Sequence, residues 1–145
     1  GLNVHQLIRR VEEFLAEVDQ IRDMHIEISS FGFKHGLPSD ADLVMDVRFL
    51  PNPFFDPQLK EKTGLDSEVR EFLASQASYV AFMQGFGDLI RMILPQYRLE
   101  GRAYLKIAIG CTGGRHRSVA VAEALAALIA SDGFKAKLSH RDLVI

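Results

Sequence analysis

The apolar positions of the chain predict helices that alternate with strands. In the first segment they recur at steps of three and four residues, which is typical of an amphipathic helix: Val4, Leu7, Ile8, Val11, Phe14, Leu15, Val18 and Ile21. Two more helical regions are expected, over residues 66–94, ended by Pro95, and over residues 118–131. Strands are expected over residues 24–33, 43–49, 103–110 and 135–140.

The order of these elements predicts an α/β fold. Strands that alternate with helices favour parallel pairing, so we expect a mainly parallel central sheet of about four strands with helices on both faces. The length of 145 residues suits a single domain over residues 1–145. Ligands of such sheets bind beyond the carboxyl ends of the strands. Three polar segments follow predicted strands and are expected to meet there: residues 32–36, 46–52 and 110–118.

Residues 110–118 read Gly-Cys-Thr-Gly-Gly-Arg-His-Arg-Ser, between the clearest strand and the clearest helix. Glycines let a ligand approach the backbone closely. The first amides of a helix have no partner within it, and the helix dipole makes that end positive. Hydroxyl and basic side chains supply further donors. The segment therefore predicts a phosphate-binding loop made of Cys111, Thr112, Gly113, Gly114, Arg115, His116, Arg117 and Ser118.

The same loop has the Cys-x5-Arg-Ser spacing of cysteine-dependent phosphatases. A helix N-terminus and nearby cations lower the pKa of a thiol, so Cys111 could be a nucleophile, with Arg117 holding the phosphate. However, Gly110 replaces the histidine that usually precedes this cysteine, and the Gly-Gly pair runs directly into basic residues, as in a binding cradle. We therefore expect binding without catalysis and keep a phosphatase as the alternative.

Charge is distributed unevenly along the chain. The net charge is −2, but residues 102–141 carry seven lysines and arginines against two acidic residues, which gives +5 there and −7 elsewhere. This asymmetry predicts an anionic partner, either a phosphorylated small molecule or a nucleic acid. The single cysteine favours a reducing compartment, the cytoplasm. No apolar run is long enough to predict a membrane span, and no His/Cys cluster has the spacing of a metal site.

Two further segments offer side chains to the same site. Lys34 and His35 lie between glycines just after a predicted strand. Asp46 and Arg48 alternate on one face of the next strand, so they could form a structural ion pair. Alternatively, Asp46 or Asn52 could accept hydrogen bonds from a sugar or an amine.

Five sequence blocks resemble the C-terminal domain of the RapZ/YvcJ family, whose members are called RNase adapter proteins or nucleotide-binding proteins. They are Ser-Phe-Gly-Phe-Lys-His-Gly at 30–36, Asp-Val-Arg-Phe-Leu-Pro-Asn-Pro at 46–53, Thr-Gly-Leu-Asp at 63–66, Ile-Gly-Cys-Thr-Gly-Gly with His-Arg-Ser within 109–118, and His-Arg-Asp at 140–142. The resemblance implies an upstream kinase-like domain with a P-loop, absent from this chain, which binds ATP or GTP and could hydrolyse it. Residues 1–22 would then be a helix that leads in from that domain.

The resemblance also implies that this domain regulates and does not catalyse, and that it has no cofactor of its own. Relatives in enteric bacteria sense glucosamine-6-phosphate, bind small RNAs and present them to RNase E. By this resemblance the loop at 111–118 would hold the phosphate, and the sugar would face His35, Asp46, Arg48 and Asn52. The RNA-binding candidates are Arg115, Lys135, Lys137, His140 and Arg141. A homo-oligomer without membrane attachment is expected.

Overall fold

The computed structural model describes the backbone of residues 1–21 and 23–144 and the side chains of residues 1–15 and 23–144. Its elements are α1 (Val4–Ile21), β1 (His25–Gly32), η1 (Phe33–His35), β2 (Leu43–Asp46), η2 (Pro53–Phe55), α2 (Ser67–Ala74), α3 (Ala77–Glu100), β3 (Tyr104–Cys111), α4 (Arg117–Ser131) and β4 (Ala136–His140). The elements η1 and η2 are short 3₁₀ helices. The predicted alternation of strands and helices is confirmed.

The strands form one parallel sheet in the order β2-β3-β1-β4. The central strands β1 and β3 pair over their whole length, from His25 opposite Tyr104 to Gly32 opposite Cys111. The aliphatic side chains at alternate positions of these strands face the core: Ile26, Ile28, Leu105, Ile107 and Ile109. The predicted parallel α/β fold is therefore confirmed.

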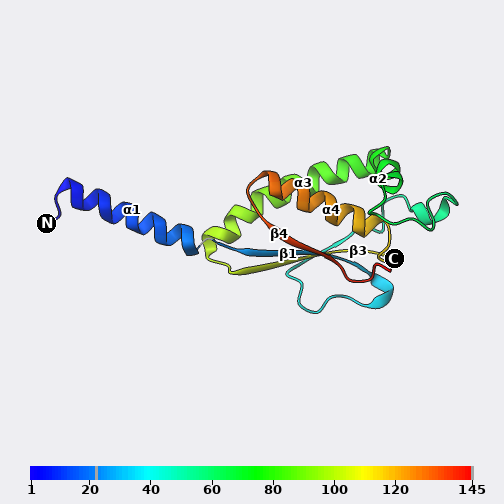
Figure 1. Ribbon diagram of the computed structural model, residues 1–145, viewed down its shortest axis with the longest axis horizontal. Coiled ribbons are helices and arrows are strands. Elements are labelled where there is room, and N and C mark those ends of the chain that lie inside the picture. The colour runs from blue at the N-terminus through cyan, green and yellow to red at the C-terminus, as the bar shows by residue number, and fades with distance from the viewer. Residues whose placement is uncertain (22, 145) are drawn as a thin grey trace.

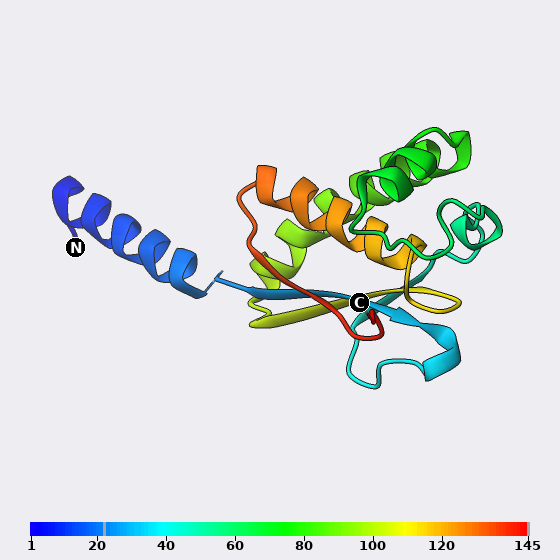
Figure 2. The same ribbon diagram turned by 45° about the vertical axis from the view of Figure 1, so that its right-hand side comes forward.

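Helices α3 and α4 lie on the same face of the sheet (Figures 1 and 2). Helix α4 packs on β1, β3 and β4, and its Val121, Leu125 and Ile129 are completely buried. The opposite face is crossed by the segment between β1 and β2. The part of the prediction that placed helices on both faces is corrected accordingly.

The sequence of β1 explains why one face of the sheet can stay open. Parallel sheets usually bury both faces under helices, and their strands are then apolar throughout. Here the buried Ile26 and Ile28 alternate with His25, Glu27 and Ser29, which point to the other face. These polar side chains can face water, so this side of β1 needs no apolar cover before Phe31, which lies on the same side and is 0% exposed.

The prediction that Pro95 ends a helix is wrong, because α3 continues to Glu100 with Pro95 inside it. A proline within a helix costs about 3 kcal/mol. The preceding turns of α3 bury Ile90 and Leu94, which are each 1% exposed. Each such side chain contributes about 1.5–3 kcal/mol, so the packing of α3 on the core offsets the local cost of the proline.

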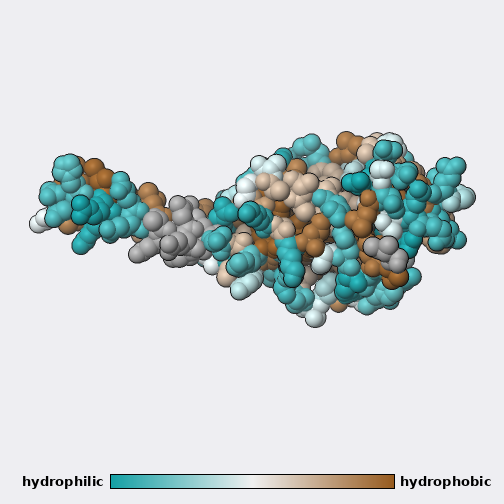
Figure 3. Space-filling model, viewed as in Figure 1, coloured by the Kyte–Doolittle hydropathy of each residue, from teal (hydrophilic) through white to brown (hydrophobic). Residues whose placement is uncertain are grey.

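Helix α1 extends away from the sheet (Figure 1). Its first turn is capped reciprocally, because the Gln6 amide donates to Asn3 Oδ1 at 2.8 Å and the Asn3 amide donates to Gln6 Oε1 at 3.0 Å. The apolar side chains at residues 4–15 are between 49% and 70% exposed and contribute the brown patches on this helix in Figure 3: Val4, Leu7, Ile8, Val11, Phe14 and Leu15. None of the helices in the described residues is long and apolar enough to cross a membrane.

Close backbone contacts at glycines join the carboxyl ends of β1 and β3. A Cβ atom on Gly32 would overlap the backbone of Gly113, and a Cβ atom on Gly114 would lie 2.7 Å from the amide nitrogen of Gly32. Gly114 also has a φ of +78°, a conformation that favours glycine. These contacts hold the loop after β3 against the end of β1, which fixes the position of the predicted phosphate-binding loop.

Candidate phosphate-binding site

The predicted phosphate-binding loop joins β3 to the N-terminus of α4. Two carbonyl groups of the loop accept hydrogen bonds from the rest of the protein: Lys34 N donates to Thr112 O at 3.2 Å, and Gly64 N donates to Arg115 O at 3.0 Å. The amides of the loop are different: within the described part of the chain, the backbone amides of residues 113–116 donate no hydrogen bond. Unpaired amides next to the positive end of a helix, here one of 15 residues, are the backbone groups to which anions bind in proteins.

The loop borders a cavity of about 660 Å³. The cavity lies beyond the carboxyl ends of the strands, as expected for a parallel sheet. Residues from four separate parts of the chain line it: Lys34, His35, Asn52, Phe54, Phe55, Cys111, Thr112, Gly113, Arg115, His116, Arg117, Asp142 and Val144. The three polar segments expected to meet at this edge of the sheet therefore do meet there.

Arg117 is the most deeply buried cation of the site, at 4% exposure. Its Nη1 donates to the carbonyls of Arg48 at 2.7 Å and Leu50 at 3.0 Å, and its Nη2 donates to Thr112 Oγ1 at 3.3 Å. Its Nε is buried and has no hydrogen-bond partner among the described residues. Burial lowers the pKa of Arg117. A buried N–H without a partner is costly, and the neighbouring Cys111 acts through its charge and a hydrogen bond against the effect of burial on the pKa of Arg117.

The side chains of Arg115 and His116 are turned toward the segment at residues 59–62. Arg115 donates to the carbonyl of Glu61, to that of Lys62 at 2.9 Å and to that of Val144 at 3.3 Å. His116 Nε2 lies 3.1 Å from the carbonyl oxygens of both Leu59 and Lys60, and burial lowers the pKa of His116. Both residues border the cavity, but these contacts leave their backbone amides as the groups that could bind an anion.

The geometry around Cys111 bears on the alternative of a phosphatase. Cys111 is 3% exposed, and its Sγ lies 3.0 Å from Ser118 Oγ. A Cβ atom on Gly110 would overlap the rings of Phe31 and Phe33, so the packing excludes a histidine at that position. Asp142 is the carboxylate among the residues that line the cavity. Burial raises the pKa of Asp142, but hydrogen bonds from Arg141 and the Gly32 amide lower it by more, so the net pKa is below the ordinary value. This carboxylate is therefore ionised and poorly suited to protonate a leaving group.

Two of the four predicted sugar-side residues, His35 and Asn52, line the cavity. The other two, Asp46 and Arg48, bind each other: Arg48 Nη2 donates to Asp46 Oδ2 at 2.6 Å, and the Arg48 guanidinium lies 3.9 Å from the centre of the Phe33 ring. The hydrogen bond from Arg48 lowers the pKa of Asp46. This pair is the structural ion pair that the alternation of residues 46 and 48 allowed.

Lys34, which the sequence offered to this site together with His35, lines the cavity. Four further residues that line it were not among the predicted site residues: Phe54, Phe55, Asp142 and Val144. Phe54 and Phe55 are 48% and 81% exposed in η2, inside a proline-rich loop. The sequence position of Asp142 does not predict a place in the site. Its carboxylate is held at the cavity by the backbone amide of Gly32, which is distant in the sequence and donates to Asp142 Oδ2 at 2.7 Å.

The five RNA-binding candidates do not form one surface. Lys135 and Lys137 lie at the amino end of β4, while Arg115 lies at the opposite end of the sheet. His140 binds Ser30 Oγ at 2.7 Å and Glu123 Oε1 at 3.0 Å, and Arg141 binds Asp142 and the Gly36 carbonyl. The basic C-terminal third of the sequence is therefore split by the fold.

The fold and the loop together define a parallel α/β domain with a glycine-rich turn of unpaired amides at a helix N-terminus. The chain belongs to the RapZ family, because residues 24–144 match the family described as the RapZ C-terminal domain. The resemblance noted from the sequence blocks is thereby confirmed.

Similar proteins support the same assignment. A nucleotide-binding protein of Corynebacterium jeikeium is 48% identical over 141 residues, which are 97% of this chain and 48% of that protein. A nucleotide-binding protein of Anaeromyxobacter dehalogenans is 51% identical over 142 residues, which are 98% of this chain and 48% of that protein. One of Geobacter sulfurreducens is 47% identical over 141 residues, 97% of this chain and 50% of that protein. The chain thus spans about half the length of these relatives.

Proposed function

We propose that this domain is a regulatory sensor that binds a phosphorylated amino sugar, with glucosamine-6-phosphate as the first candidate. The observation that carries the proposal is the combination of unpaired amides at residues 113–116 with the buried, unpaired Nε of Arg117 at the same helix start. Charge-assisted hydrogen bonds contribute about 1.5–3 kcal/mol each. Three of them sum to about 4.5–9 kcal/mol, which corresponds to a Kd between roughly millimolar and sub-micromolar.

The rest of the cavity suits a polar ring beside the phosphate. The volume of about 660 Å³ exceeds the needs of a phosphate alone. Asn52 uses its Oδ1 to accept from the Phe54 amide at 3.1 Å, which leaves its NH2 group for a hydroxyl. The ionised Asp142 offers a negative charge to an ammonium group, which favours an amino sugar over a neutral one.

Family membership supports two wider parts of the proposal. We propose that, in the full-length cytoplasmic protein, the metabolite controls the binding of small RNA for presentation to RNase E. The relatives are named nucleotide-binding proteins. We also propose that the nucleotide is ATP or GTP and that it binds to the half of the longer protein outside this chain. The homo-oligomer expected from the resemblance remains a prediction.

Calorimetric titration tests the sensor directly. Glucosamine-6-phosphate is compared with glucosamine, which lacks the phosphate, and with glucose-6-phosphate, which lacks the amine. We expect glucosamine-6-phosphate to bind tightest and glucosamine not to bind. Equal binding of glucosamine and its phosphate would contradict the role of the loop.

A phosphatase is the second candidate, on the strength of the buried contact between Cys111 and Ser118 at the loop. Phosphate release from the same sugar phosphate, measured with the unmodified chain and with Cys111→Ser, separates the two functions. Turnover that disappears with this substitution would favour the phosphatase. Stoichiometric binding without phosphate release favours the sensor.

A further inference from the structure

The two most exposed large apolar side chains of the described residues both line the cavity at the phosphate-binding loop. They are Phe55, which is 81% exposed, and Val144, which is 76% exposed. Phe54 lines the same cavity. The amides and the guanidinium group that we assign to the phosphate do not involve these side chains. Large apolar side chains that lie together at the surface mark places where a protein contacts another molecule.

The segment that carries the two phenylalanines is attached at both ends to the phosphate-binding loop. Before the phenylalanines, Arg117 Nη1 donates to the carbonyl of Leu50 at 3.0 Å. After them, His116 Nε2 lies 3.1 Å from the carbonyl oxygens of Leu59 and Lys60. Two neighbouring side chains of the loop therefore hold both ends of this segment, and the position of η2 relative to the loop is fixed.

The backbone of η2 is also held in one conformation. Pro53 is buried at its start, a position where a helical turn needs no amide donor. The Phe54 amide donates to Asn52 Oδ1 at 3.1 Å, and the Phe55 amide donates to the Asn52 carbonyl at 3.2 Å. The two aromatic rings therefore stand on a preformed turn, which lowers the entropic cost of binding a ligand against them.

The ring of Phe55 keeps a free face. Phe54 and Phe55 meet edge to face, with centroids 5.7 Å apart and an angle of 81° between the planes. In such a pair each ring has at most one face covered by the other. Phe54 has a second partner, because Lys60 Nζ lies 4.8 Å from the centre of its ring. Phe55 thus presents the more open flat apolar surface at the cavity.

We propose that Phe55 packs against the face of a pyranose ring, so that the site selects the closed, cyclic form of a sugar phosphate. This proposal rests on the proposed function, because the phosphate held at the loop brings the sugar into the cavity. In a glucosamine pyranose the substituents at C2 to C5 are equatorial, and the axial C–H bonds make both faces of the ring apolar. Packing such a face on an aromatic ring removes apolar surface of both from water and breaks no hydrogen bond.

Titration calorimetry with a matched pair of ligands tests the proposal. Glucosamine-6-phosphate is compared with 2-amino-2-deoxyglucitol-6-phosphate, which keeps the amine and the phosphate but cannot close a ring. We expect the original chain to bind the cyclic ligand more tightly. Phe55→Ala should weaken the cyclic ligand about 3- to 30-fold and the open-chain ligand less. Inorganic phosphate, which has no ring, should bind this variant and the original chain equally.

Phe55→Trp provides a second readout that does not depend on affinity. The chain contains no tryptophan, so the tryptophan fluorescence of this variant reports on position 55 alone. We expect glucosamine-6-phosphate and glucose-6-phosphate to change the emission, because both present a pyranose ring, and inorganic phosphate to leave it unchanged.

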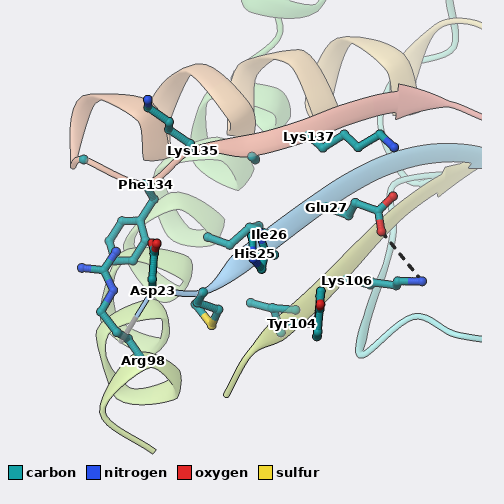
Figure 4. Close-up of a pocket in the computed structure, with 14 residues that line it drawn as sticks. Asp23, His25, Ile26, Glu27, Arg98, Tyr104, Lys106, Phe134, Lys135 and Lys137 are labelled. Atoms are coloured by element: carbon teal, nitrogen blue, oxygen red, sulfur yellow. Dashed lines mark ion pairs between the residues drawn. The ribbon is translucent and has the colours of Figure 1, made fainter. Parts of the chain in front are cut away.

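Tyr104→Ala is the matched control. Tyr104 is 66% exposed and lines a different cavity, of about 780 Å³, at the amino ends of β1, β3 and β4 (Figure 4). No residue lines both cavities. This substitution also removes an exposed aromatic ring, and it should leave the affinity for each of these ligands unchanged.

The results separate this proposal from the sensor function. If glucosamine-6-phosphate binds the original chain and Phe55→Ala equally, or if Phe55→Ala weakens the cyclic and open-chain ligands by the same factor, the ring contact is overturned and the sensor function stands. Weaker binding of inorganic phosphate to Phe55→Ala would also overturn the ring contact, because the substitution would then act through the loop. If the original chain binds no sugar phosphate, both proposals fail.

Discussion

Replacing Gly114 with alanine should destabilise the domain strongly, whereas the same change at the neighbouring Gly113 should not. Gly114 has a φ of +78°, and a Cβ atom there would lie 2.7 Å from the amide nitrogen of Gly32 and 2.9 Å from the carbonyl carbon of Phe31. Left-handed backbone costs a residue with a side chain about 1–2 kcal/mol. Forcing packed backbone apart adds about 1–3 kcal/mol.

The expected loss for Gly114→Ala is therefore about 2–5 kcal/mol in the free energy of unfolding. For a domain of this size that corresponds to a fall in Tm of roughly 5–20 °C. A Cβ atom on Gly113 would meet only Lys34 Cε and Nζ, each at 3.8 Å, and the φ of Gly113 is not positive. Gly113→Ala should change stability by no more than about 0.5 kcal/mol.

Urea and thermal unfolding followed by circular dichroism measure both variants against the original chain. Gly113→Ala should still lose affinity for the sugar phosphate, because its methyl group enters the cavity beside Lys34. Equal stability of the two variants would refute the described contact between the loop and the end of β1. A stable Gly113→Ala with unchanged ligand affinity would refute the assignment of this loop to the ligand.

Three further predictions concern single residues of the site. Arg117→Lys should lower sugar-phosphate affinity by more than about tenfold, since one ammonium group cannot replace the three hydrogen bonds and the buried Nε of the guanidinium; titration of the variant measures this. Asp142→Asn should weaken the binding of glucosamine-6-phosphate but not of glucose-6-phosphate, and an equal loss for both would argue against an ammonium contact. Burial lowers the pKa of His116 below its ordinary 6.5. Between that lowered pKa and 6.5 the unfolded chain binds a proton that the folded chain does not, so stability should fall as the pH drops below about 6.5. His116→Gln, which keeps a donor for the carbonyls of residues 59 and 60, should show a flatter pH dependence of unfolding.

Local sequence patterns predicted most of the fold and the place of the site. The apolar run of β3, the glycine-rich turn and the alanine-rich α4 follow one another directly, so short-range rules were sufficient for them. Pro95 was misjudged because the packing of α3 on the core outweighs a local breaker. The sequence does not predict the open face of the sheet, because the polar alternation in β1 covers only a few residues.

The directions of long side chains could not be predicted. Arg115 and Arg117 are two residues apart with the same chemistry, yet Arg115 binds the carbonyls near residue 61 and Arg117 binds those of residues 48 and 50. These acceptors are more than fifty residues away in the sequence. The position of these carbonyls depends on the complete tertiary structure, so the spacing of residues in the sequence does not predict which of them each arginine binds.

The contacts of the last described residues have a practical consequence for anyone who handles this chain. The Gly32 amide donates to Asp142 Oδ2, and Arg115 donates to the carbonyl of Val144, so this short segment forms one wall of the cavity at the loop. A chain that ended at Arg141 would lack this wall, and the Gly32 amide at the end of β1 would lose its acceptor, Asp142 Oδ2. An affinity tag is therefore better attached ahead of α1, which extends away from the sheet (Figure 1).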